Sequence, residues 1–192
     1  MLEITKDIIS ALKEKKLSGE SVFDGKILHV KNDVVELPNK KTATREVIGH
    51  NGAVCIVALK DNGNVIMEYQ YRYAVGEVML EIPAGKLDSK DEDPRSAAIR
   101  ELREETGAIA EKLTYLGQYI PSPAILEERI YMYLAEGLTF TECDYDEDEF
   151  MTLAEIPLED AVEMALSGLL PDGKTQAALL RVYLAKEREG KK

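Results

Sequence analysis

The stretch GKLDSKDEDPRSAAIRELREETGA, residues 85–108, decides what fold the chain can adopt, because it contains a well-delimited helix. Asp93 is a favourable N-cap, and Pro94 suits the first helical position. Gly107 is typical of the residue just past a helix end. We therefore predict a helix that begins at Pro94 and ends before Gly107. Its apolar stripe consists of Ala98, Ile99 and Leu102.

Three carboxylates of this helix share one face about one turn long. Glu101, Glu104 and Glu105 stand at positions i, i+3 and i+4, where like charges destabilise a helix by about 0.2–0.5 kcal/mol per pair. Two interpretations account for them. They either form a solvated face together with the neighbouring arginines, or they bind a hard cation, since Mg²⁺ takes oxygen ligands. The spacing alone does not choose between the two.

The segments on both sides of the helix predict strands. Alternating apolar residues in SVFDGKILHVKNDVVEL and the hairpin signal Asn62-Gly63 indicate strands in the first half. After the helix come three strand-like segments, LTYLGQYI, RIYMYLAEGL and MTLAEI, and two closing helices. This order favours an α+β fold, an α/β/α sandwich with a mixed sheet between helices. Residues 3–16 form either an amphipathic helix or a loosely attached arm.

The composition excludes several classes of partner. The formal net charge of the 192 residues is −12, so the chain repels nucleic acid, and no block of Lys or Arg offsets this. An anionic substrate therefore needs local help, from a few arginines or from a bound cation. The first residues hold no unbroken apolar run, so we expect no membrane span. We expect a cytoplasmic protein in which Cys55 and Cys143 stay reduced and Cys55 lies in the core.

The predicted helix and the turn before it resemble the signature of the Nudix hydrolases, Gly-x5-Glu-x7-Arg-Glu-U-x-Glu-Glu-x-Gly-U, in which U is aliphatic. The matching positions are Gly85, Glu92, Arg100, Glu101, Leu102, Glu104, Glu105, Gly107 and Ala108. Six residues, instead of five, separate Gly85 from Glu92. We interpret the difference as a one-residue insertion in the surface loop DSKD. Either Asp91 or Glu92 then fills the acidic position of the signature.

Other segments resemble the ADP-ribose pyrophosphatase branch of that family, notably Ser122-Pro123, after which Ala124 replaces the usual glycine. The resemblance implies a Nudix fold. Residues 1–48 are expected to form a helix or arm and antiparallel strands that serve in a homodimer, and residues 49–192 the hydrolase domain. The implied activity is Mg²⁺-dependent hydrolysis of ADP-ribose to AMP and ribose 5-phosphate. The alternatives are another nucleoside diphosphate sugar, such as ADP-glucose or GDP-mannose, and a non-catalytic ADP-ribose sensor.

The resemblance also implies a set of metal ligands. Glu101 and Glu105 are the principal ligands, Glu104 bridges ions or holds a bound water, and the backbone carbonyl of Ala84 completes the set. All are hard oxygen donors, which suit Mg²⁺ or Mn²⁺ in its place. Two or more such ions polarise a pyrophosphate and lower the pKa of an attacking water. A cation at this position would compensate the mutual repulsion of the three carboxylates.

The general base and the substrate contacts follow from the same resemblance. Glu147, in the acidic segment DEDEF, matches the base, and Glu149 matches an additional metal contact. His29 and His50 are less suitable as bases because both lie on strand-like segments. The positions that match substrate-binding residues of relatives are Arg45, Arg72, Ser122, Pro123 and Glu128.

Overall fold

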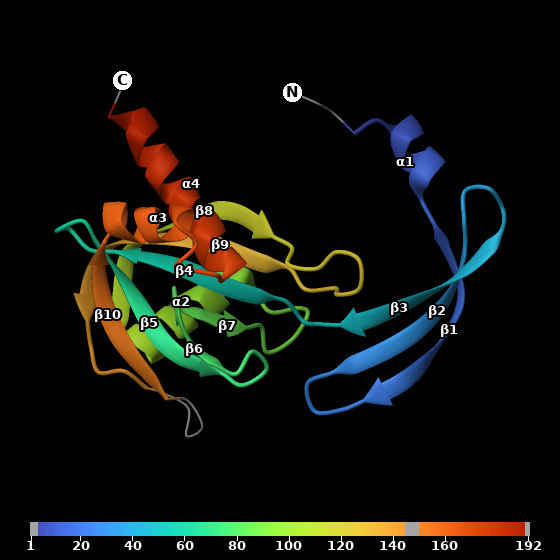
Figure 1. Cartoon of the computed structure of the whole chain (residues 1–192), viewed down its shortest axis with the longest axis horizontal. Helices are drawn as coiled ribbons and strands as arrows, with labels where there is room; N and C mark the ends of the chain where they lie inside the picture. The colour runs from blue at the N-terminus through green and yellow to red at the C-terminus, as the bar shows by residue number, and fades with distance from the viewer. Residues whose placement is uncertain (1–3, 145–149, 191–192) are drawn as a thin grey trace. The chain divides into compact units, whose positions relative to one another are not determined.

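The computed structural model describes residues 4–144 and 150–190. The chain divides into two compact units. Figure 1 colours the chain by residue number, from blue at the N-terminus to red at the C-terminus. The first comprises residues 1–50 and 122–128, and the second comprises residues 51–121 and 129–192. The first unit therefore combines the N-terminal region with seven residues from the middle of the chain.

The first unit is built on an antiparallel sheet of three strands in the order β1-β2-β3. Its elements are α1 (Lys6–Leu12), β1 (Lys15–Asp24), β2 (His29–Glu36) and β3 (Thr42–Gly49). Every residue of α1 and β1 is exposed. Ile27 and Leu28 lie in the turn before β2 and not on the strand that the alternating pattern predicted. Residues 122–128 join this unit through β3, where the Ile48 amide donates to the Ile125 carbonyl at 2.7 Å.

The second unit contains a mixed sheet of seven strands. They are β4 (Ala53–Leu59), β5 (Asn64–Arg72), β6 (Glu77–Glu81), β7 (Ala84–Lys86), β8 (Ala108–Tyr119), β9 (Ile130–Phe140) and β10 (Met151–Pro157). The main path runs β10-β5-β4-β9-β8, while β6 pairs with β5 and β7 pairs with β4. The β4–β9 pair is parallel and the other pairs are antiparallel. The predicted mixed sheet is therefore confirmed.

Helices cover both faces of this sheet. All seven residues of β4 are buried, and they alternate between two cores. Cys55 and its neighbours on one face pack with residues of α3 (Leu158–Leu166) and α4 (Gly173–Glu189). Val54 and Ile56 on the other face pack with α2 (Pro94–Thr106). The α/β/α sandwich predicted from the order of elements is thus present, and Cys55 lies in the core.

The ends of α2 agree with the sequence prediction, whereas its apolar face differs at one position. The Asp93 side chain accepts a hydrogen bond from the Ser96 amide, and Gly107 closes the helix in the left-handed conformation, with φ of 68°. The buried apolar residues are Ala97, Ala98 and Leu102. Ile99 is 51% exposed, so its place in the predicted stripe was wrong. It lies about 100° around the helix from Ala98, which turns it away from the sheet. Within the described residues, no helix is long and apolar enough to cross a membrane.

Candidate active site

The carboxylate of Glu101 lies directly against the backbone of β7. A Cβ atom at Gly85 would overlap the carboxyl group of Glu101, so glycine is the residue that leaves room for it. Glu101 itself is 9% exposed. The first glycine of the signature and the first glutamate of its helix are therefore packed together, although they are separated by a loop and almost two turns of helix.

The neighbouring residue of β7 holds a second carboxylate. The Ala84 amide donates a hydrogen bond of 2.9 Å to Oε2 of Glu105, which is 3% exposed. Ala84 and Gly85 pair with Cys55 and Val54 of the buried strand β4. Two glutamates from one face of α2 are thus seated on two consecutive residues of a strand that is fixed by the sheet.

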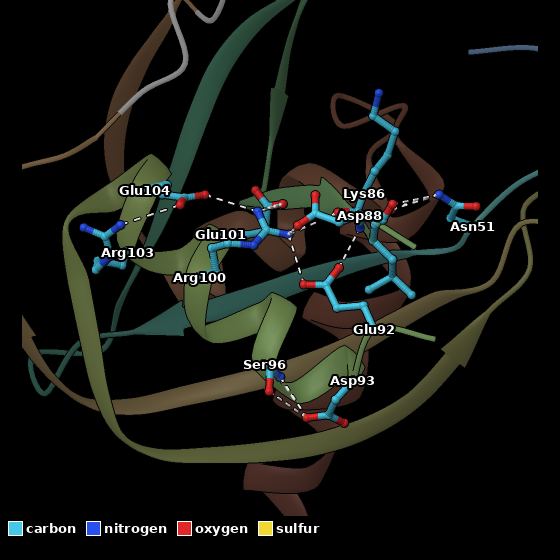
Figure 2. A network of polar contacts seen from close by, with 11 residues as sticks. Asn51, Lys86, Asp88, Glu92, Asp93, Ser96, Arg100, Glu101, Arg103 and Glu104 are labelled. Carbon is cyan, nitrogen blue, oxygen red and sulfur yellow. Dashed lines mark hydrogen bonds and ion pairs between the residues drawn. The ribbon is translucent and has the colours of Figure 1, made fainter. Parts of the chain in front are cut away.

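Arg100 connects three of the four glutamates of the signature (Figure 2). Its Nη1 donates to Oε1 of Glu101 at 2.7 Å and to Oε2 of Glu104 at 3.2 Å. Its Nη2 donates to Oε1 of Glu92 and to the Lys86 carbonyl, both at 3.4 Å. The guanidinium therefore holds three glutamates and the end of β7 in one network. A planar fork of donors suits this task, because it can contact several acceptors at fixed angles.

The pKa of Arg100 reflects the same network. Burial alone would lower this pKa, but the charge of Glu101 and the hydrogen bonds to Glu101 and Glu104 outweigh burial and raise it above its ordinary value. The guanidinium consequently remains charged, and it offsets part of the repulsion among the carboxylates. One of the two interpretations of the spacing was a solvated helix face in which arginines neutralise the carboxylates. Arg100 does neutralise them, but this face is half-buried.

Glu92 fills the acidic position before the helix. Its Oε2 accepts a hydrogen bond of 2.6 Å from the Asp88 amide, in addition to its contact with Arg100. Asp91 is exposed, and the DSKD loop that carries the extra residue is exposed throughout. On the other side of this loop, Asn51 donates to the carbonyls of Leu87 and Asp88. The loop therefore accommodates the insertion while Glu92 keeps its place in the network of Figure 2.

The donor atoms around β7 fit a hard divalent cation. They are carboxylate oxygens of Glu101, Glu104 and Glu105 and the carbonyl of Ala84, and Mg²⁺ prefers oxygen ligands of this kind. In residues 4–144 and 150–190, however, no three acidic, histidine or cysteine side chains converge into a ready metal cluster. Glu101 and Glu104 instead point toward Arg100 (Figure 2). Binding of a cation would therefore require these side chains to divide their oxygens between Arg100 and the ion.

The predicted base and its neighbour, Glu147 and Glu149, lie outside the described residues. Asp144, which precedes them in the sequence, is anchored at the end of α2, because its amide donates to the Glu104 carbonyl at 2.9 Å. The Asp144 carboxylate also lies 3.4 Å from Arg103, which in turn contacts Glu104. Asp144 thus lies beside Arg103 and Glu104 at the end of α2.

Arg72, a predicted substrate contact, is held by a buried carboxylate that the sequence analysis did not single out. Its Nε and Nη2 donate to the two oxygens of Glu81 at 2.7 and 2.9 Å. Lys174, at the start of α4, donates to Oε2 of Glu81 as well. The sequence contains only a weak signal for this cluster, a glutamate at the end of an apolar strand, which usually marks nothing more than a strand end.

The remaining predicted substrate contacts belong to the first unit. Arg45 on β3 forms an ion pair of 2.5 Å with Glu14, and Glu128 lies 3.7 Å from the ring of His50. The Ser122 carbonyl accepts hydrogen bonds from the amides of Ile125 and Leu126, which makes the Ser-Pro segment a turn. Lys40 is the sole non-glycine residue with positive φ in the described part of the chain, so Ala124 adopts an ordinary backbone conformation. The alanine therefore introduces no strain in place of glycine.

Comparison with known protein families agrees with this geometry. The model of the NUDIX domain matches residues 49–178, which is more than half of the chain. The chain belongs to the Nudix family. A second model, the nucleoside diphosphate sugar hydrolase N-terminal domain, matches residues 14–48. The two matches meet near the end of β3, where the sheet of the first unit ends.

Nudix relatives with related names align over most of the chain. The ADP-ribose pyrophosphatase of Bacillus subtilis (strain 168) is 39% identical over 186 residues, covering 96% of this chain and 100% of the relative. That of Mycobacterium tuberculosis (strain ATCC 25618 / H37Rv) is 38% identical over 170 residues, covering 87% and 82%. A GDP-mannose pyrophosphatase of Yersinia pestis (strain Pestoides F) is 33% identical over 134 residues, covering 65% and 67%. Among solved structures, one titled "Crystal structure of ADP compounds hydrolase" matches with a TM-score of 0.78 and 25% identity, covering 93% of this chain and 96% of that one.

Proposed function

We propose that this Nudix protein hydrolyses the pyrophosphate of ADP-ribose to AMP and ribose 5-phosphate, with Mg²⁺ as its cofactor and Mn²⁺ as a substitute. The observation that carries the proposal is the seating of Glu101 and Glu105 on the Ala84–Gly85 backbone. Two relatives named ADP-ribose pyrophosphatase support the choice of substrate. Hydrolysis of another nucleoside diphosphate sugar is the second candidate, because the GDP-mannose pyrophosphatase is also a relative.

The residues of β7 and α2 would hold the metal. Glu101, Glu105 and the Ala84 carbonyl serve as ligands, and Glu104 holds a further ion or its water. A divalent cation bound there polarises the pyrophosphate and makes a water nucleophilic at neutral pH. Arg100 orients Glu101 and Glu104 from the opposite side. Partners of this kind, which fix a ligand's orientation, commonly affect metal affinity or activity by about 10- to 100-fold.

Glu147 is our choice for the general base, and Glu149 for an additional metal contact. The support from described residues is indirect: Asp144 is bound to the end of α2 beside Glu104. A chain that leaves this anchor can bring a carboxylate near the metal ligands within a few residues. A general base must reach its water within hydrogen-bond distance, which such a position allows.

Arg72 is our choice for the contact with the diphosphate. Two of its three guanidinium nitrogens bind Glu81, and Nη1 lies outside these two hydrogen bonds. The side chain is 36% exposed, so an anion can reach it. Arg45, Ser122, Pro123 and Glu128 remain further candidates for substrate contacts.

We also propose that the protein is cytoplasmic and that it forms a homodimer through its first unit. Large apolar side chains of this unit are exposed, namely Leu17, Val22, Phe23, Ile27 and Leu28. Exposed apolar side chains that lie together commonly mark an interaction surface. Both cysteines are free thiols, which suits a reducing compartment.

Sedimentation equilibrium of the full chain should give twice the monomer mass, and Phe23→Ser should weaken the association. A monomer mass at all concentrations would refute the dimer.

The substrate is tested by measuring AMP release from ADP-ribose, with ADP-glucose and NAD⁺ alongside and GDP-mannose followed by GMP release. Each is supplied at equal concentration, with Mg²⁺ and again with EDTA. We expect fast cleavage of ADP-ribose that EDTA abolishes. Preference for another sugar would retain the chemistry and replace the substrate. If the folded protein binds ADP-ribose but hydrolyses none of these compounds, the result would favour a non-catalytic ADP-ribose sensor.

A further inference from the structure

The carboxylate of Glu81 binds two cations, one of them 9 and the other 93 positions away in the sequence. Arg72 on β5 binds both of its oxygens, and Lys174 at the start of α4 binds Oε2. Glu81 and Lys174 have side chains that are 2% and 11% exposed, so this is an interior ion cluster. Lys174 also donates to Asp172 at 3.0 Å. No step of the proposed hydrolysis uses Lys174.

Lys174 supplies a second positive charge beside the carboxylate that holds Arg72. Glu68 is the cross-strand partner of Glu81, and both are buried. Glu81 alone would cancel the charge of Arg72, and that pair would offer no net positive charge to a diphosphate. Lys174 adds a second positive charge beside Glu81, and it also binds Asp172, which caps the helix through the Thr175 amide.

The pKa values agree with this balance. Burial would raise the pKa of Glu81, but the hydrogen bond from Arg72 and the charge of Lys174 outweigh it and lower the pKa. Burial would likewise lower the pKa of Lys174, but the charges of Asp172 and Glu81 raise it. Both residues are therefore charged at neutral pH.

The first turn of α4 holds Lys174 in place. The Asp172 side chain caps the helix by accepting from the Thr175 amide at 2.9 Å. The buried Thr175 hydroxyl accepts a hydrogen bond of 3.1 Å from the Ile82 amide. Lys174 thus binds the side chain of Glu81, and Thr175 binds the backbone of the next residue, Ile82. The lysine has little freedom to leave the carboxylate.

We propose that Lys174 is a positioning residue for substrate binding: it holds and neutralises Glu81, so that Arg72 keeps a fixed orientation and a positive charge available to the diphosphate. The inference rests on the proposed function of Arg72. It assigns Lys174 no contact with substrate or metal. Its effect must therefore pass through Glu81 to Arg72, and it should alter substrate binding more than the chemical step.

The test compares Lys174→Met, Lys174→Arg and Arg72→Met with the double variant. Lys186→Met is the matched control, because Lys186 lies on the same helix and forms an ion pair of 3.1 Å with Glu136 in a different part of the unit. We expect Lys174→Met to raise KM for ADP-ribose about tenfold, with kcat changed less than about twofold. Lys174→Arg should restore most of the affinity, and Lys186→Met should leave KM unchanged.

The double variant gives the sharpest outcome. If Lys174 acts through Arg72, adding Lys174→Met to Arg72→Met should raise KM no further. Independent, multiplicative effects of the two changes would overturn the proposal, as would an unchanged KM in Lys174→Met. If Lys174→Met does not fold, Lys174→Gln, which can still donate to Glu81 but has no charge, replaces it. Calorimetric titration with the α,β-methylene analogue of ADP-ribose should show the same loss of affinity without turnover.

Failure of the proposed function looks different. Absence of hydrolysis by the unaltered protein refutes the function itself. An unchanged KM in Arg72→Met refutes the role of Arg72, and with it the role of Lys174. A raised KM in Arg72→Met together with an unchanged KM in Lys174→Met refutes only the inference about Lys174.

Discussion

The Glu101 carboxylate occupies the space that a side chain on Gly85 would need. This relationship joins β7 to the face of α2 that carries the acidic residues. Gly85→Ala should push the carboxylate away from β7 and destabilise the protein by about 1–3 kcal/mol, the usual cost of overpacking. Hydrolysis should be lost even at temperatures where the variant is folded.

Gly49→Ala is a suitable control for that substitution. Gly49 also lies on a strand, its backbone needs no positive φ, and a Cβ there would be 3.5 Å from its nearest neighbour. Thermal unfolding and AMP release should be close to those of the unaltered protein. Full activity of Gly85→Ala would show that the position of Glu101 against β7 does not matter.

Glu105→Gln separates a metal ligand from a merely repelling charge. If Glu105 ligates the metal, the variant should lose about 100-fold in kcat/KM and bind Mn²⁺ more weakly in an electron paramagnetic resonance titration. If the three carboxylates were only a charged helix face, the same change should relieve repulsion, raise stability and leave hydrolysis intact. Glu163→Gln, an exposed glutamate on α3, controls for the loss of a charge.

Arg100→Lys tests whether the geometry of the guanidinium matters beyond its charge. Arg100 binds Glu101 and Glu104 through one nitrogen and Glu92 through another, which a single ammonium cannot reproduce. We expect about a tenfold loss of activity, by analogy with other residues that orient metal ligands. Kinetics at saturating Mg²⁺ and in a Mg²⁺ titration measure it. Activity equal to that of the arginine protein would mean that a positive charge alone suffices.

Acid should weaken the protein partly through Glu81. The pKa of Glu81 in the folded state is lowered from its ordinary 4.5. The unfolded chain therefore takes up its proton first as the pH falls, and the stability that Glu81 contributes is complete above pH 4.5 and lost on passing through the folded pKa. In urea unfolding, the stability advantage over Glu81→Gln should be largest near pH 7 and shrink as the pH falls below about 5. A difference independent of pH would contradict the charged state of Glu81.

Local signals explain why much of α2 could be predicted. The cap at Asp93 and the stop at Gly107 act within a few residues, so the sequence contains them in full. The exposed Ile99 shows the limit of the same reasoning. The sequence presents Ala98, Ile99 and Leu102 as one apolar stripe, but it does not reveal which of them face the sheet. The acidic positions of the Nudix signature could be named in advance, but their common anchor on Ala84 and Gly85 depends on the pairing of β7 with β4.

Contacts between distant segments could not be predicted. Lys174 and Glu81 are 93 positions apart, and only the placement of α4 on the sheet brings them together. In the same way, residues 122–128 belong to the first unit through their hydrogen bonds with Ile48 on β3, although the sequence places them between two strands of the second. Such contacts depend on the whole fold and have no local pattern.

The most direct test of the central claim is hydrolysis of ADP-ribose in ¹⁸O-labelled water, followed by mass spectrometry of both products. The account predicts one ¹⁸O atom in the phosphate of either AMP or ribose 5-phosphate, formed in the presence of Mg²⁺ and not with EDTA. Cleavage that persists in EDTA, or products without ¹⁸O in either phosphate, would contradict a metal-dependent attack of water on phosphorus.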